Sequence, residues 1–176
     1  GLELLARWNR PDGKHIGPDK FIPIAEEIGL INDLMLQMLE QYCVDARQWP
    51  EQLAVAINLS AVQLRDNWLG QKILAMLVKH GVSPHRLAVE ITESAIISDE
   101  DAAFRTITSL RNQGVSISLD DFGTGYSSLH YLRTFPYDKL KIDRSFVLSL
   151  FSSSESEKIV NSVVALANSL GLTVVA

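Results

Sequence analysis

Two adjacent carboxylates, Asp120 and Asp121, come directly after residues 115–119, where apolar side chains alternate with serines. This alternation predicts a strand that carries both acids to its C-terminal end. Neighbouring carboxylates repel each other, and cations remove most of the cost of holding the two charges together. The pair therefore indicates a divalent metal site, with a turn that caps a helix starting near Tyr126 as the alternative. The glycine-rich segment 122–125 favours the metal site, because glycines let the backbone approach a ligand.

Four more polar residues lie within or at the C-terminal end of other predicted strands: Glu3, Asn58, Glu90 and Lys141. Lys141 is a hydrogen-bond donor that could serve such a site directly. The alternative role for Lys141 is a salt bridge from the end of its strand to Asp120 or Asp143.

Six strands are expected to position these residues, over residues 1–8, 53–57, 87–91, 115–119, 138–143 and 172–176. Helices are expected between the strands, and glycines or a proline mark several of their ends. The first two cover residues 19–28, before Gly29, and 31–49, before Pro50. The third begins with Asn67 as its cap and ends at Gly81, and the fourth begins with a capping box of Ser98 and Asp101 and ends at Gly114. The last two cover residues 126–133 and the segment from the serines 152–154 to Leu170. Alternating strands and helices form a βαβ series, which builds a parallel sheet with right-handed crossovers.

A βαβ series forms either a doubly wound open sheet or a TIM barrel, which has eight strands and usually about 250 residues. The polar residues at the strand ends favour the barrel, because a barrel builds its active site from residues at the ends of successive strands, whereas an open sheet would place them along a line. The chain also ends inside an apolar strand without a breaker. We therefore expect an α/β, TIM-barrel-like (β/α) barrel that is incomplete. Residues 1–176 are expected to form a single partial domain that lacks the first strand and the last barrel units.

The composition narrows the classes of function. With 176 residues and 47% hydrophobic content the chain can bury a core, and no apolar run approaches the length of about 20 residues that spans a membrane. A net charge of −5 argues against binding to polymeric nucleic acid, whereas a small phosphorylated ligand is compatible if metals supply positive charge. The single cysteine, Cys43, excludes an internal disulfide and is expected to be a small buried hydrophobe. We expect a cytoplasmic protein, or the cytoplasmic part of a membrane-anchored one.

Six segments, in order along the whole chain, resemble the EAL family of cyclic di-GMP phosphodiesterases: Glu3-Leu4-Leu5-x-Arg7-Trp8, Phe21-Ile22-Pro23-x-Ala25-Glu26, Asn58-Leu59-Ser60, Glu90-Ile91-Thr92-Glu93-Ser94, Asp120-Asp121-Phe122-Gly123-Thr124-Gly125 and Lys141-Ile142-Asp143. The resemblance implies a modified TIM barrel in which two Mg²⁺ or Mn²⁺ ions direct a water at one phosphodiester of cyclic di-GMP. The implied product is linear pGpG.

The resemblance also implies a role for each candidate residue. The implied metal ligands are Glu3, Asn58, Glu90, Asp120 and Asp121, with Asp120 bridging the two ions. Lys141 would hold or polarise the attacking water, and Arg7 would bind the ligand. Glu93 would support the loop 122–125, and a cap or a surface acid is the alternative for Glu93.

The chemistry of these residues agrees with the implied cofactors. Carboxylate and amide oxygens, without a His or Cys cluster, suit Mg²⁺ or Mn²⁺ and not Zn²⁺. Two such ions stabilise both the entering and the leaving oxygen of a phosphoryl displacement. Ca²⁺ is larger and takes more ligands in irregular geometry, so it is expected to inhibit by permitting binding without cleavage.

The sequence departs from the family pattern at two points. Leu4 stands where the family's namesake alanine is found, and we expect this apolar change to repack with little effect on the chemistry. The family pattern also continues past Ala176, where a further acidic residue serves the second metal.

Three hypotheses follow from these observations: a phosphodiesterase, a module that binds cyclic di-GMP without cleaving it, and a regulatory or dimerisation domain. The expected partners are cyclic di-GMP and a second copy of the chain, which would form a homodimer through the region Phe122–Tyr131. In the full protein we expect fusion to sensor or GGDEF domains.

Overall fold

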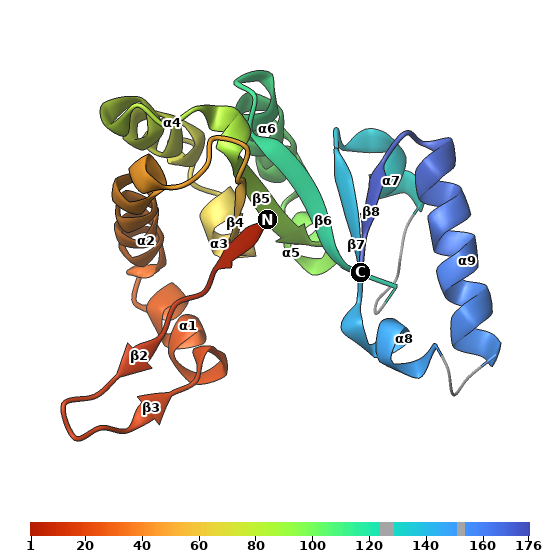
Figure 1. The fold of residues 1–176 in the computed structure, drawn as a ribbon, viewed down its shortest axis with the longest axis horizontal. Coiled ribbons are helices and arrows are strands. Elements are labelled where there is room, and N and C mark those ends of the chain that lie inside the picture. The colour runs from red at the N-terminus through yellow and green to blue at the C-terminus, as the bar shows by residue number, and fades with distance from the viewer. Residues whose placement is uncertain (124–128, 151–153) are drawn as a thin grey trace.

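The structure is a computed structural model that describes residues 1–123, 129–150 and 154–176. Its central feature is a sheet of six strands in the order β1 (Leu2–Leu4), β4 (Val55–Asn58), β5 (Leu87–Thr92), β6 (Ser116–Phe122), β7 (Lys139–Ile142) and β8 (Thr173–Val175). Each strand pairs in parallel with the next (Figure 1). Parallel strands that follow chain order around a curled sheet are the arrangement of a TIM-type barrel. The prediction of an incomplete α/β barrel with about six strands is therefore confirmed.

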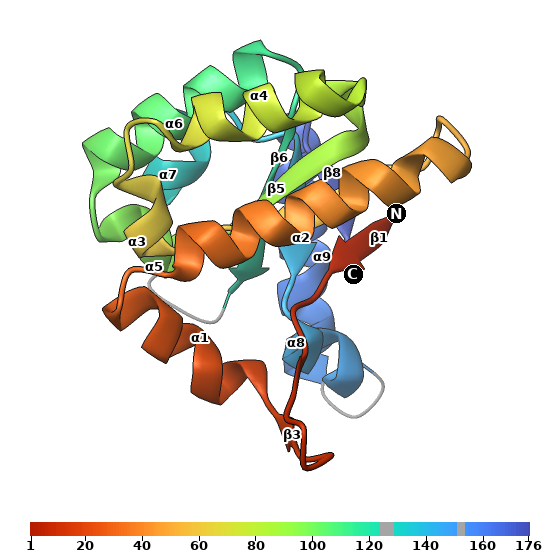
Figure 2. The same ribbon diagram turned by 90° about the vertical axis from the view of Figure 1, so that its left-hand side faces the viewer.

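Helices connect successive strands of the sheet. They include α1 (Pro18–Glu27), α2 (Ile31–Asp45), α4 (Leu69–His80), α6 (Glu100–Asn112), α7 (Leu129–Thr134) and α9 (Ser154–Ser169). Helix α4 packs between α2 and α6, and α9 packs on β7 and β8. Figure 2 shows α2, α4 and α6 as one layer over the sheet. Within the described residues, no helix combines the length and the apolar character that crossing a bilayer requires.

The core lies between the sheet and this helix layer. Leu39 of α2, Ile73 of α4 and Ile107 of α6 have no exposed surface, and Leu87 and Ile91 of β5 are equally buried. Strands that are covered in this way read as continuous apolar runs, which is why the sequence predicts them as buried parallel strands.

The segment before α1 differs from its prediction. Strand β1 ends at Leu4, and β2 (Trp8–Asn9) pairs with β3 (His15–Ile16) in an antiparallel hairpin. Residues 9–13, with Pro11 and the pair Asp12-Gly13, have the composition of a turn, and they form the turn of this hairpin. Gly13 has a φ of 79°, and its N–H donates to the Arg10 carbonyl at 2.9 Å. The two-residue strands are too short to show a periodicity, so sequence reasoning missed their pairing.

Short helices and caps account for the other differences. Four short helices were not predicted: α3 (Ala61–Leu64), α5 (Glu93–Ile97), α8 (Arg144–Ser149) and the 3-10 helix η2 (Pro84–Arg86). The 3-10 helix η1 (Ala46–Gln48) follows α2 directly and lies within the segment 31–49 that was predicted as one helix. The predicted capping box of Ser98 and Asp101 is wrong, because Ser98 ends α5 with helical backbone angles, and Asp99 caps α6 by accepting the Ala102 N–H at 3.1 Å. Asn67 does not cap α4 either, since Asp66 accepts the Trp68 N–H at 2.9 Å.

Candidate active site

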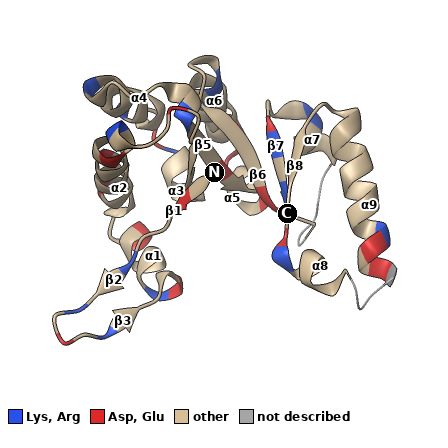
Figure 3. Ribbon diagram, viewed as in Figure 1, with Lys and Arg blue, Asp and Glu red and all other residues tan. Residues whose placement is uncertain are grey.

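The sheet register brings the predicted polar residues to the same side of five neighbouring strands. Glu3 lies on β1, Asn58 on β4 and Glu90 on β5. Asn58 is the direct partner of Glu90 in the β4–β5 pair, and its Nδ2 donates to Oε1 of Glu3 at 2.7 Å. Figure 3 shows acidic residues where β1 and β6 end.

Lys141 on β7 joins two of the acids. Its Nζ lies 2.6 Å from Oε2 of Glu90 and 2.9 Å from Oδ2 of Asp120. Burial alone would lower the pKa of Lys141, but the hydrogen bonds that its ammonium donates to both carboxylates outweigh burial and raise the pKa. Burial raises the pKa of Glu90, which is 7% exposed, against the opposing effect of Lys141. Of the two salt bridges suggested for Lys141, the one to Asp120 is present. Asp143 accepts the Ser145 N–H at 2.9 Å. The contact of Lys141 with Glu90 was not predicted.

Asp120 and Asp121 lie in a bulge of β6. Leu119 pairs with Leu140 and Phe122 pairs with Ile142, so that two residues of β6 stand opposite the single Lys141 of β7. Asp121 takes a φ of 54°, and its N–H donates to Oδ1 of Asp120 at 2.9 Å. Burial raises the pKa of Asp121, and the negative charge of Asp120 makes the second largest contribution in the same direction. Bulges of this kind redirect side chains beside active sites, because they interrupt the strict alternation of a strand.

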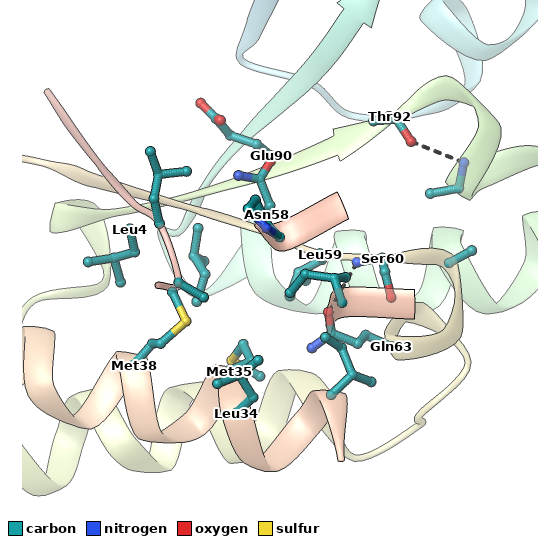
Figure 4. Close-up of a pocket in the computed structure, with 18 of the residues that line it drawn as sticks. Leu4, Leu34, Met35, Met38, Asn58, Leu59, Ser60, Gln63, Glu90 and Thr92 are labelled. Carbon is teal, nitrogen blue, oxygen red and sulfur yellow. Dashed lines mark hydrogen bonds between the residues drawn. The ribbon is translucent and has the colours of Figure 1, made fainter. Parts of the chain in front are cut away.

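A cavity of about 490 Å³ opens beside Glu90. Arg7, Asn58 and Glu90 line its polar side, and Leu4, Leu34 and Met38 belong to its apolar side (Figure 4). Arg7 is exposed, and Nη1 of its guanidinium donates to the Ala6 carbonyl at 3.0 Å. The predicted ligand-binding arginine thus lines the same cavity as two of the predicted metal ligands.

The donor set fits a hard divalent cation by its chemistry. Glu3, Glu90 and Asp120 supply carboxylate oxygens and Asn58 supplies an amide oxygen, which are the ligands that Mg²⁺ and Mn²⁺ prefer. Within the described residues, no three His, Cys, Asp or Glu side chains lie close enough together to hold an ion by themselves. The Lys141 ammonium provides the positive charge between Glu90 and Asp120.

Glu93 is the first residue of α5 and is 7% exposed. It is therefore buried and not a surface acid. The loop that it was predicted to support continues into residues 124–128, which lie outside the described residues, as does the predicted helix start near Tyr126. The same gap interrupts the predicted dimerisation region Phe122–Tyr131, so the homodimer stays a prediction.

Sequence reasoning missed several residues of the cavity. Leu34 and Met38 belong to a stripe on α2 that the helical spacing assigns to the core, yet both line the cavity. Gln63 also lines it and is buried. Its signal was present in the sequence, because Ser60 and Gln63 have the S-x-x-Q spacing of a capping box.

Comparison with known proteins identifies the family of this chain. The sequence model of the EAL domain family matches residues 1–176. The bifunctional diguanylate cyclase/cyclic di-GMP phosphodiesterase MucR of Pseudomonas aeruginosa is 40% identical over 180 residues, which cover 100% of this chain and 26% of MucR. The cyclic di-GMP phosphodiesterase NbdA of the same organism is 40% identical over 179 residues, which cover 99% of this chain and 23% of NbdA.

A solved structure described as the PaMucR phosphodiesterase in complex with c-di-GMP has the same fold. It superimposes with a TM-score of 0.91 at 39% identity, and the match covers 99% of this chain and 72% of that one. The chain spans about a quarter of the length of the curated relatives that it matches. Because the family match covers all of its residues, the chain belongs to the EAL domain family.

Proposed function

We propose that the protein hydrolyses cyclic di-GMP to linear pGpG with two Mg²⁺ or Mn²⁺ ions. The observation that carries this proposal is the convergence of Glu3, Asn58, Glu90, Asp120 and Lys141, from five neighbouring strands, beside a cavity that Arg7 also lines. The relatives named MucR and NbdA are described as cyclic di-GMP phosphodiesterases, which supports the same substrate.

Glu3, Asn58, Glu90 and Asp120 are the proposed ligands of one ion, and Asp120 with Asp121 serves the second. Bound ions of this kind supply a polarised water and neutralise charge on the phosphate oxygens. The net reaction forms a bond between the water oxygen and phosphorus, breaks one bond from phosphorus to a ribose oxygen, and moves a proton to that oxygen.

Protonated Lys141 is proposed to orient the attacking water, since its ammonium donates and cannot accept a proton. Arg7 is proposed to bind a phosphate through its planar guanidinium, which matches phosphate oxygens with two parallel hydrogen bonds. The apolar side of the cavity, with Leu34 and Met38, is proposed to cover a purine base and exclude water from it.

Binding of cyclic di-GMP without cleavage is the second candidate. One observation favours it: no three carboxylates gather at metal-binding distance among the described residues, and Lys141 already bonds to both Glu90 and Asp120 and offsets one of their two negative charges. A module of this kind would bind the ligand through the cavity and Arg7 and would not depend on Glu3, Glu90, Asp120 and Asp121.

The test is hydrolysis of cyclic di-GMP by the full-length gene product in Mg²⁺, Mn²⁺ or Ca²⁺, with pGpG measured by chromatography. We expect turnover in Mg²⁺ and Mn²⁺, and binding without turnover in Ca²⁺, because the larger ion misplaces the water. Equal rates in Ca²⁺ and Mg²⁺ would contradict the two-metal proposal. Binding without turnover in all three ions would establish the second candidate.

A further inference from the structure

Gln63 in α3 is a buried polar residue with 2% of its surface exposed, and both ends of its amide are paired. Its Oε1 accepts the Ser60 N–H at 3.1 Å, and its Nε2 donates to Oδ1 of Asn32 at 3.2 Å. Asn32 in turn donates from Nδ2 to Oδ2 of Asp66 at 3.0 Å. We call this series, from the Ser60 N–H to Asp66, the amide chain. It joins the end of β4 to α2 and to the segment that precedes α4.

The two ends of the amide chain fix the direction of every bond in it. The Ser60 N–H can only donate, and an ionised carboxylate can only accept. Asp66 stays ionised because Lys72 donates to it at 2.7 Å, which lowers its pKa against the effect of burial, and the Trp68 N–H adds to the lowering. Gln63 and Asn32 each have one acceptor and one donor end, so each has a single orientation that satisfies its neighbours.

The amide chain ends next to the candidate metal site. Ser60 comes two residues after Asn58, and the residue between them, Leu59, donates its N–H to the Glu90 carbonyl at 2.9 Å. The N–H groups of the two residues after Asn58 are therefore both bound, one by the backbone of Glu90 and one by the side chain of Gln63. Figure 4 shows Gln63 and Glu90 on opposite sides of the segment Asn58–Ser60.

We infer that Gln63 is a positioning residue that fixes the amide oxygen of Asn58 for the divalent ion. The inference rests on the proposed function, since it assigns Gln63 to the metal site proposed there. Residues that orient metal ligands in this indirect way change metal affinity or activity by about 10–100-fold when they are replaced.

The direction of the amide chain provides a sharp test. Gln63→Glu keeps an acceptor for the Ser60 N–H but removes the donor to Asn32, so that two oxygens face each other whichever way Asn32 turns. Asp66→Asn alone replaces one accepting oxygen by an NH2 group, which then faces a donor of Asn32, Lys72 or Trp68. The two substitutions together reverse the bonds between positions 63, 32 and 66, so that every member of the amide chain again has a partner. The exposed Lys72 ammonium, which donates to Oδ2 of Asp66 in the unaltered protein, then turns to solvent.

The measurement is Mn²⁺ affinity of the full-length protein by calorimetry, without substrate, at a temperature at which circular dichroism shows every variant folded. Gln63→Glu and Asp66→Asn are each expected to weaken Mn²⁺ binding about tenfold or more, and the pair is expected to return to within about threefold of the unaltered protein. The control is Gln41→Glu, the same change at an exposed glutamine of α2 whose amide donates to Asp45. It is expected to leave Mn²⁺ affinity unchanged.

Hydrogen exchange of the Ser60 amide gives a second readout, and Gln63→Met is expected to accelerate it by removing the acceptor. If Gln63→Glu binds Mn²⁺ as tightly as the unaltered protein, or if the pair binds more weakly than either single variant, the inference is wrong. An unaltered protein that binds Mn²⁺ but does not cleave cyclic di-GMP would overturn the proposed hydrolysis alone, because the Mn²⁺ titration would still decide the role of Gln63. An unaltered protein that binds no Mn²⁺ would overturn both.

Discussion

Nζ of Lys141 lies 2.6 Å from Oε2 of Glu90, which pairs a residue of β7 with a residue of β5 across the intervening strand β6. Strands two places apart in a sheet are separated by about 10 Å, so only a long side chain on the same face can make such a contact. The pair therefore places Lys141 and Glu90 on one face, where Asp120 of β6 also contacts Lys141 at 2.9 Å.

Lys141→Ala is expected to lower kcat for cyclic di-GMP about 100-fold or more, because a donor aimed at the reacting atoms matters most in the transition state. Affinity for cyclic di-GMP in Ca²⁺ is expected to stay nearly unchanged. Calorimetry and steady-state kinetics on the full-length protein measure the two effects. Lys139→Ala, two residues earlier on β7, is the control and should keep full activity. Loss of binding in Lys141→Ala would show that Lys141 holds the ligand instead.

Arg7→Ala is expected to raise KM for cyclic di-GMP about tenfold or more, with a smaller effect on kcat. The phosphate is charged in both the ground state and the transition state, so removing the guanidinium weakens the binding of the substrate and of the transition state to a similar extent. Arg10→Ala is the matched control, because Arg10 pairs with Asp12 in the hairpin at 3.2 Å and does not line the cavity. A variant of Arg7 that lost kcat while keeping its KM would reverse the roles assigned to Arg7 and Lys141.

Asp120→Asn is expected to abolish turnover and leave the fold in place. The amide oxygen of the new side chain can still accept the Asp121 N–H, and Asp120 is only partly buried. The change removes the negative charge that a bridging metal ligand needs. Hydrolysis and the unfolding midpoint are measured together, with Asp101→Asn on the exposed face of α6 as the control. Wild-type activity in Asp120→Asn would refute the site assignment.

Arg86→Met is expected to lower the free energy of unfolding by about 2 kcal/mol, since hydrogen bonds from charged donors contribute about that much. The Arg86 guanidinium donates to the carbonyls of Leu53, Ala46 and Pro50 at 3.3, 3.1 and 3.2 Å, and so it holds the connection between α2 and β4. Urea unfolding measures the change. Arg105→Met, at an exposed position of α6, should shift the midpoint far less, and equal shifts would mean that the three bonds do not stabilise the fold.

Cys43 is expected to be inert toward thiol reagents in the folded protein. The side chain is fully buried, and burial raises its pKa to about 11. At pH 8 only about one thiol in a thousand would then be ionised, and the thiolate is the reactive form. A colorimetric thiol assay at pH 8 should give no fast reaction without denaturant and one thiol per chain in denaturant. Rapid labelling of the folded protein would contradict the burial of Cys43.

The sequence by itself determined the number, order and parallel pairing of the six main strands. Apolar runs such as 53–57 and 87–91 indicate strands that are covered on both faces, and glycines or prolines between the runs indicate where helices end. Because parallel strands bring their C-terminal ends to one edge, the sequence also placed Glu3, Asn58, Glu90, Asp120 and Lys141 together.

Only the tertiary structure decided how these residues meet. The Lys141–Glu90 bond joins positions 51 residues apart, and the Gln63–Asn32 bond joins positions 31 residues apart. No local pattern encodes such contacts, because they depend on the bulge at Asp120 and Asp121 and on how α2 packs beside α3. A bulge arises where pairing with the neighbouring strand favours two residues opposite one. The bulge depends on how β6 pairs with β7, and therefore it cannot be predicted from the sequence of either strand alone.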